Sequence, residues 1–175
     1  MTKNELGKKI YDVSHLTGEF LLRSGTISNE YFDKYRFESY PELLSSIAGF
    51  MKDLVPSHSE ILAGLETGGI PLSTAISLQN GMPSIFVRKE AKTYGTCKLA
   101  EGIEFDGKSV CVIEDVVTTG GQIIKSVKEL RERGAIIDTV LCVILRDEAA
   151  YKKLGEAGLT LIPLFTMEEL KKLVE

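Results

Sequence analysis

The chain has 175 residues, of which 43% are hydrophobic and 26% are charged. This composition is ordinary for a globular protein, and the length fits one domain with a sizeable core. The formal net charge of −4 argues weakly against a nucleic-acid partner, which would favour a basic surface.

The three cysteines, Cys97, Cys111 and Cys142, form no Cys-x-x-Cys pair. Cys111 and Cys142 lie in apolar runs and are interpreted as small buried hydrophobes. Neither a disulfide framework nor a zinc site is expected, which fits a reducing, cytoplasmic location. The N-terminal sequence has no apolar stretch behind its charges, so no signal peptide is visible, and the longest apolar run, 140–145, is too short to span a bilayer.

The first third of the chain mixes helical and strand patterns. Apolar residues at three- to four-residue spacing predict helices over 3–16 and 41–55. Between them, residues 18–35 are rich in aromatic, β-branched and turn residues, which predicts short strands and turns. Residues 1–35 are therefore expected to form a small segment beside the main part of the domain.

From residue 61 onward, strands and helices alternate. The predicted strands are 61–65, 84–89, 109–115, 139–146 and 159–165. The predicted helices are 70–80, 121–133, 147–157 and one capped by Thr166, with Glu169 completing a capping box. Residues 90–108 are expected to form a long loop.

This alternation implies βαβ units. The expected fold class is α/β: a single domain, 1–175, with a mainly parallel sheet flanked by helices over residues 60–165. Ligands of such sheets bind beyond the carboxyl ends of the strands, so the strand ends are the places to search for a site.

The strongest functional pattern is VCVIEDVVTTGGQI, residues 110–123. An apolar strand ends in Glu114 and Asp115, and a turn with two threonines and two glycines opens a helix. Free backbone N–H groups, the helix dipole and the glycines together make an anion site. The two acids can accept hydrogen bonds from sugar hydroxyls beside the anion, so the run indicates a ribose 5-phosphate site. The alternative is a turn that only caps a helix.

A second pattern is basic. Arg88, Lys89 and Lys92 lead into the long loop 90–108. Long loops in compact domains are often functional lids, and cations that close over a leaving group stabilise its charge and exclude water. The alternative is a solvated run of charge.

VCVIEDVVTTGG resembles the phosphoribosyl pyrophosphate signature of the type I phosphoribosyltransferases, in which the acids hold ribose hydroxyls and the Thr/Gly loop holds the 5-phosphate. Glu66-Thr67-Gly68-Gly69-Ile70-Pro71 is similar to the pyrophosphate loop of that family. The resemblance implies that Asp115 is catalytic and that the donor is bound by Thr67, Gly68, Glu114, Asp115, Val116, Val117, Thr118, Thr119, Gly120, Gly121 and Gln122.

FVRKEAKTYGTCKLAEG, residues 86–102, resembles the catalytic loop of the orotate phosphoribosyltransferases. The resemblance implies that Arg88, Lys89, Lys92 and Tyr94 bind the donor and that Arg88 and Lys92 are catalytic. Lys92 is expected to matter most to the rate. The sequence departs from the family at Tyr94, where histidine is usual. In the family some of these lid residues reach the neighbouring subunit, which implies a homodimer.

HLTGEFLLRSGTISNEYFD, residues 15–33, resembles the hood that covers the base in the same enzymes. The resemblance implies that Arg23, Tyr31 and Phe32 face orotate, together with Thr118. Core packing is the alternative for the two aromatic residues.

Arg146 ends the strand that follows the phosphate helix, where the family uses an arginine for the carboxylate of orotate. The usual Asp-Arg followed by glycine is replaced here by Arg146 followed by Asp147. The alternative is a surface arginine paired with Asp147 or Glu148.

The resemblance implies transfer of the phosphoribosyl group to orotate with Mg²⁺ bound through the substrate, since no protein metal cage is visible. The expected partners are the two small-molecule substrates and a second copy of the chain, without nucleic acid or membrane. Two alternatives stay open: a phosphoribosyltransferase for a purine or another base, and a non-catalytic regulator that senses phosphoribosyl pyrophosphate.

Overall fold

The computed structural model describes residues 1–21, 25–90 and 99–175. Its main sheet has the strand order β5-β4-β3-β6-β7-β8, and all neighbouring strands are parallel except β4 and β5. The strands are β3 (Ile61–Leu65), β4 (Ser84–Val87), β5 (Ala100–Glu101), β6 (Ser109–Val117), β7 (Ile136–Leu145) and β8 (Thr160–Thr166). The predicted α/β class with a mainly parallel sheet is confirmed.

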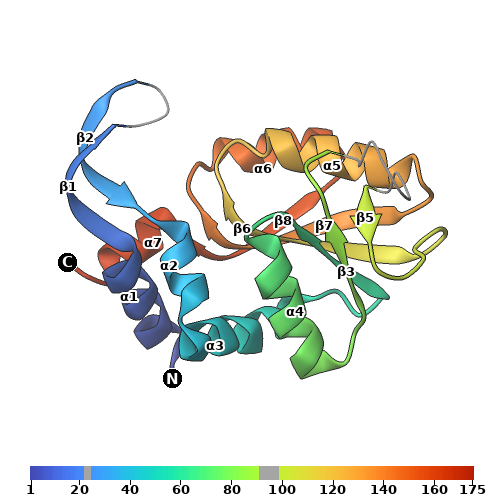
Figure 1. The fold of residues 1–175 in the computed structure, drawn as a ribbon, viewed down its shortest axis with the longest axis horizontal. Coiled ribbons are helices and arrows are strands. Elements are labelled where there is room, and N and C mark those ends of the chain that lie inside the picture. The colour runs from blue at the N-terminus through green and yellow to red at the C-terminus, as the bar shows by residue number, and fades with distance from the viewer. Residues whose placement is uncertain (22–24, 91–98) are drawn as a thin grey trace.

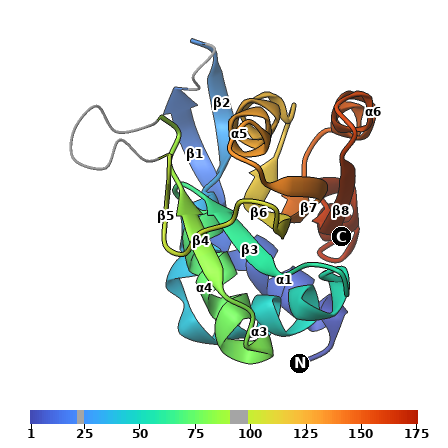
Figure 2. The ribbon, with the colours of Figure 1, turned by 90° about the vertical axis from the view of Figure 1, so that its right-hand side faces the viewer.

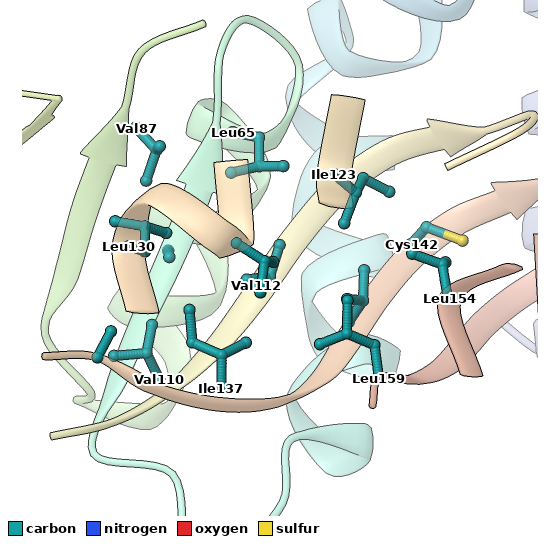
Figure 3. Close-up of a cluster of buried hydrophobic side chains, with 14 of the residues drawn as sticks. Leu65, Val87, Val110, Val112, Ile123, Leu130, Ile137, Cys142, Leu154 and Leu159 are labelled. Carbon is teal, nitrogen blue, oxygen red and sulfur yellow. The ribbon is translucent and has the colours of Figure 1, made fainter. Parts of the chain in front are cut away.

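Helices cover both faces of this sheet (Figures 1 and 2). The helices are α1 (Lys3–Ser14), α2 (Lys34–Ser39), α3 (Pro41–Met51), α4 (Gly69–Asn80), α5 (Gly121–Arg131), α6 (Ala149–Glu156) and α7 (Met167–Lys172). Side chains of α5 and α6 pack on one face of the sheet, as Figure 3 shows for Ile123, Leu130 and Leu154. Helices α1 to α4 and α7 pack on the other face. Both faces of the central strands are therefore buried, which explains their nearly continuous apolar sequences.

The two described cysteines belong to opposite faces of the sheet. Cys111 and Cys142 are both 0% exposed and lie in different hydrophobic clusters. Burial raises the pKa of Cys111 to about 12 and also raises the pKa of Cys142. The interpretation of both as small buried hydrophobes is confirmed, because a thiol with a raised pKa is unreactive.

An antiparallel hairpin, β1 (His15–Leu21) and β2 (Ile27–Phe32), projects from the body beside α1 and α2 (Figure 1). It corresponds to the strands predicted within residues 18–35. The predicted first helix ends earlier than expected, at Ser14, because His15 takes an extended conformation with ψ 119°.

Several boundaries differ from the sequence predictions. Helix α2 was not predicted, because six residues are too few to show a helical period; its N-terminus is capped by Asp33, whose side chain accepts a hydrogen bond from the backbone N–H of Tyr35 at 3.1 Å. The loop prediction for 90–108 is wrong at β5, a two-residue strand that exists only through pairing with β4. Strand β6 continues past Asp115 to Val117.

The remaining differences are at the ends of elements: the strand predicted over 84–89 ends at Val87, and the strand predicted from 139 begins at Ile136. The helix predicted over 41–55 ends at Met51 and continues as a 3-10 turn, Lys52–Leu54. None of the helices in the described ranges has the length and apolar character needed to cross a membrane.

Candidate functional site

The sheet order changes direction between β3 and β6, because β4 lies on one side of β3 and β6 on the other. In open parallel sheets a crevice forms at this point, beyond the carboxyl ends of the strands. A cavity of about 440 Å³ lies there. It is lined by Lys34, Tyr35, Glu66, Thr67, Lys89, Glu114, Val116, Val117, Thr118, Thr119, Gly120, Gly121, Gln122 and Ile123. We call this space the phosphate cavity.

The turn between β6 and α5 forms one wall of the phosphate cavity. Gly120 precedes the helix in the left-handed conformation, with φ 71°, which favours glycine. Within the described residues no side chain caps α5, so its first backbone N–H groups are available to a ligand. Thr118 and Thr119 are exposed beside them. The wall therefore offers N–H groups, hydroxyls and a positive helix end to an anion.

The two acids of β6 point in different directions, because successive side chains of a strand alternate between its faces. Glu114 is partly buried and lines the phosphate cavity. Asp115 is 0% exposed and is absent from the lining of that cavity. The sequence motif predicts both acids at the ribose, whereas the structure brings only Glu114 to the cavity wall.

Asp115 forms an ion pair with Lys34 of α2, with 2.6 Å between Oδ2 and Nζ. Burial works to raise the pKa of Asp115, but hydrogen bonds from Glu114 and Lys34 outweigh it, and the pKa is lowered. Burial works to lower the pKa of Lys34, and the hydrogen bond and charge of Asp115 reverse this, so that pKa is raised. The pair is therefore charged at neutral pH.

Two other carboxyl groups near Asp115, those of Glu114 and Glu38, have raised pKa values. Burial, followed by the hydrogen bond and the charge of Asp115, raises the pKa of Glu114 well above its usual range. Burial and the charge of Asp115 raise the pKa of Glu38 to about 8. One cation cannot balance three clustered carboxylates, of which Asp115 is fully buried and Glu38 and Glu114 are partly buried, so the negative charge is concentrated on Asp115.

Gly68 is buried behind the cavity wall and does not line the phosphate cavity. Its φ of −70° suits any residue, so space and not conformation requires glycine. A Cβ at this position would overlap the carboxylate of Asp115 and come within 2.7 Å of Glu38 Oε1. Gly68 thus allows the β3–α4 turn to approach the acidic cluster closely.

The basic residues after β4 have different surroundings in the structure. Lys89 lines the phosphate cavity. Arg88 does not, and its Nε lies 3.4 Å from Oε1 of Glu101 on β5. Arg23, Lys92 and Tyr94 lie outside the described residues.

A second cavity of about 270 Å³ contains three of the residues that the sequence assigned to the base. Tyr31, Phe32 and Arg146 line it together with Tyr11, His15, Ser28, Glu30, Met167 and Lys171. We call it the base cavity.

The two cavities adjoin at the ends of β6 and β7. The backbone N–H of Arg146 donates to the carbonyl of Val117 at 2.8 Å, and Val117 and Thr118 line the phosphate cavity. A lining residue of one cavity is therefore in direct contact with a lining residue of the other.

Sequence reasoning missed several lining residues. Lys34 and Tyr35 were missed with helix α2. Tyr11 of α1 and His15, the first residue of β1, have rings that stack with centroids 4.9 Å apart. This contact depends on the turn from helix to strand, which the sequence pattern did not locate. Met167 and Lys171 come from the opposite end of the chain, and nothing in their local sequence linked them to the hood.

The described residues hold no group of three or more His, Cys, Asp or Glu side chains placed to bind a metal ion. The oxygen donors of the phosphate cavity, the Glu114 carboxyl and the threonine hydroxyls, suit a hard cation only as additions to ligand oxygens. The site thus fits a magnesium ion that arrives with a phosphorylated substrate.

The fold, with its anion site at the switch point of a parallel sheet, agrees with the phosphoribosyltransferase class that the sequence resembles, and comparisons with known proteins identify that class. The family model described as phosphoribosyl transferase domain matches residues 36–160. A curated orotate phosphoribosyltransferase from Nocardioides sp. is 47% identical over 165 residues, 94% of this chain and 92% of that protein.

Solved structures agree. An orotate phosphoribosyltransferase from Mycobacterium tuberculosis H37Rv in complex with Fe(III) dicitrate has a TM-score of 0.86 at 29% identity, covering 96% of this chain and 98% of that chain. The same enzyme with 5-phospho-alpha-D-ribosyl 1-diphosphate has a TM-score of 0.82 at 26% identity, covering 97% and 98% of the two chains. The chain belongs to the phosphoribosyltransferase family and, within it, to the orotate phosphoribosyltransferases.

Proposed function

We propose that this protein transfers the 5-phosphoribosyl group from phosphoribosyl pyrophosphate to orotate, giving orotidine 5-phosphate and pyrophosphate in pyrimidine synthesis. The single observation that carries the proposal is the junction of two cavities. Val117 of the phosphate cavity, near the anion site at the start of α5, is hydrogen-bonded to Arg146 of the base cavity. The base cavity presents two aromatic side chains, Tyr31 and Phe32, together with Arg146.

The 5-phosphate is proposed to bind at the β6–α5 turn. The N–H groups from Gly120 to Gln122 and the hydroxyls of Thr118 and Thr119 would hold its oxygens, and Glu114 would accept a hydrogen bond from a ribose hydroxyl. Fixed groups of this kind orient the reacting carbon without reorganisation during the reaction.

The base is proposed to bind between the hood and the end of β7. Tyr31 and Phe32 would contact the ring, and Arg146 would form a bidentate pair with the carboxylate of orotate. Lys171, which lines the same cavity, adds a second positive charge for that carboxylate. Because Arg146 directly follows β7 and bonds to Val117, it would hold the base toward the sugar.

The leaving pyrophosphate is proposed to lie toward Thr67 and Lys89, with Arg88, Lys92, Tyr94 and Arg23 completing its contacts. To close over the donor, Arg88 would have to leave Glu101 and bind phosphate oxygens in its place. A Mg²⁺ ion bound through the substrate would neutralise charge on the pyrophosphate and help to position it. We further propose a homodimer that shares these lid residues, located in the cytoplasm and acting on small molecules without nucleic acid or membrane.

The test is the fall in orotate absorbance when purified protein is mixed with phosphoribosyl pyrophosphate, Mg²⁺ and orotate, with adenine, hypoxanthine, xanthine and uracil assayed in parallel. Consumption of orotate alone is the expected result. Turnover of a purine in its place would assign a different base, and donor binding without turnover of any base would indicate a sensor. Light scattering of the same sample measures the molecular mass and would reveal a monomer.

A further inference from the structure

Lys34 has an unusual position for a lysine of a short surface helix. Its side chain is 35% exposed and lines the phosphate cavity, as Glu66 and Thr67 also do. Among the described lining residues, Lys34 and Lys89 are the cations, and only Lys34 is anchored to a buried acid. Lysine burial is costly without a charged partner, so the pairing with Asp115 keeps the ammonium in the cavity wall.

The geometry suggests that Asp115 acts through Lys34. Its carboxylate has no exposed surface, while the Lys34 ammonium stands between this carboxylate and the cavity. An ammonium has three donors, so pairing with Asp115 leaves others for a ligand.

Glu38 also lies next to the carboxylate of Asp115. Glu38 Oε1 and Asp115 Oδ2 are both buried without a well-aligned hydrogen bond within the described residues, so the Lys34 contact to Oδ2 is an ion pair without ideal hydrogen-bond angles. Both oxygens lie next to the position that a Cβ on Gly68 would take. One proton on Glu38 satisfies both atoms, because Glu38 can then donate to Asp115.

The position of Lys34 within the cavity indicates which part of an anionic ligand it meets. The β6–α5 turn, with its N–H groups, forms a different wall. The Lys34 ammonium pairs with Asp115 Oδ2, the oxygen that a Cβ on Gly68 would overlap, so it lies close to the β3–α4 turn, whose Glu66 and Thr67 line the same cavity. The acidic side chains on this wall would repel a phosphate group unless a cation stood among them.

We propose that Lys34 binds the pyrophosphate group of the donor, and that Asp115 and Glu38 are positioning residues that fix its ammonium toward the cavity. This inference rests on the proposed function, because it assumes that phosphoribosyl pyrophosphate is the ligand. Lys34 would remain charged during binding, and the incoming phosphate oxygens would add a second anionic partner opposite Asp115.

The first experiment compares Lys34→Met with Lys128→Met, a change at an exposed lysine of α5 with 76% side-chain exposure. Calorimetry on the whole protein measures affinity for inorganic pyrophosphate with Mg²⁺ and, separately, for ribose 5-phosphate. Lys34→Met is expected to weaken pyrophosphate binding by about tenfold or more, the usual effect of losing a charged hydrogen bond, and ribose 5-phosphate binding by less than about threefold. Lys128→Met is expected to change neither. Equal pyrophosphate affinity in the two variants would overturn the proposal.

Lys34→Met leaves Asp115 without its cation and could prevent folding. The double variant Lys34→Met/Asp115→Asn removes both charges and keeps the volume, so it is expected to fold and to bind pyrophosphate about tenfold more weakly than the wild type. A folded double variant with wild-type pyrophosphate affinity would refute the role of Lys34.

The positioning role of Glu38 has its own pair of variants. Glu38→Gln keeps a donor for Asp115 and is expected to retain pyrophosphate affinity within about threefold, whereas Glu38→Leu removes the donor and is expected to lower it further. Identical affinities for these two variants would exclude that role. Failure of the wild type to consume orotate would sink the proposed function, while calorimetry would still decide whether Lys34 binds pyrophosphate.

Discussion

The phosphate cavity and the base cavity are built in different ways. The phosphate cavity is lined mostly by one segment, 114–123, which begins near the carboxyl end of strand β6 in a sheet that is buried on both faces. The base cavity gathers residues from α1, the hairpin, the end of β7 and α7. Its Tyr31 is 45% exposed, and Arg146 is exposed as well.

Because of this difference, substitutions in the two cavities should have different effects. Changes at the phosphate cavity disturb buried charges and close backbone contacts, so they should alter both the fold and the binding of the donor. Changes at the base cavity remove exposed side chains, so they should alter the choice of base and leave the fold intact. The predictions below test this separation, beginning with the largest expected effect.

Asp115→Asn is expected to lower the free energy of unfolding by about 3 kcal/mol, because it breaks a buried ion pair. Urea denaturation measures this loss, and Asp12→Asn on the exposed side of α1 is the control, expected to stay within about 0.5 kcal/mol. The pKa of Asp115 is lowered by folding, so its contribution is present above the unfolded pKa and is lost as the pH falls through the folded pKa. A difference from wild type that persists at strongly acid pH would contradict the charge-based explanation.

Arg146→Ala is expected to reduce kcat/KM for orotate by about 100-fold, the loss of a bidentate pair with a carboxylate, without changing the urea midpoint. The affinity for phosphoribosyl pyrophosphate should change by less than about threefold. Arg133→Ala near the end of α5 is the matched control, since this exposed side chain donates to the backbone carbonyl of Glu129 in α5 and does not line the base cavity. Unchanged kinetics with orotate would remove Arg146 from the base site.

Gly68→Ala is expected to weaken donor binding about tenfold, because the added Cβ displaces the Asp115 carboxylate and disturbs its contact with Lys34. Gly155→Ala in α6 is the control: a Cβ there meets nothing within 4 Å, so stability should rise slightly. Calorimetric titration with phosphoribosyl pyrophosphate checks the first variant and thermal unfolding checks both. Wild-type donor affinity in Gly68→Ala would show that the acidic cluster does not affect the cavity.

Glu38→Gln is expected to change the pH dependence of stability by on the order of 1 kcal/mol per pH unit. Asp115, Lys34 and Asp33 are the charged groups around Glu38, and its pKa is raised to about 8 from 4.5. Between these values the unfolded chain releases a proton that the folded chain retains, so the stability of the wild type falls as the pH rises. The variant should lack this decline. Parallel stability curves from pH 5 to pH 8 would show that Glu38 ionises normally in the folded protein.

Much of the fold was predictable because local sequence and tertiary structure agree. Strand β3 is an apolar run that is buried throughout, and α7 begins at the capping box of Thr166 and Glu169. Helix α2 and strand β5 were missed because neither is long enough to show a period. The burial of Phe37 stabilises α2, and pairing with β4 stabilises β5. At the candidate site, residues 116–122 lie on the cavity wall, as the phosphate motif indicated, whereas Asp115 and Gly68 lie behind it.

The sequence by itself determined the α/β class, the anion-binding turn before α5 and the family resemblance, because each depends on residues that are neighbours in the chain. Only the tertiary structure decided that Lys34 pairs with Asp115 and that Tyr11 and Lys171 join Arg146 around one cavity. These residues are distant in sequence and meet because α2 packs over the sheet and α1 contacts α7 near the base of the hairpin (Figure 1). Contacts between distant segments depend on the packing of the whole chain, and no local pattern encodes them.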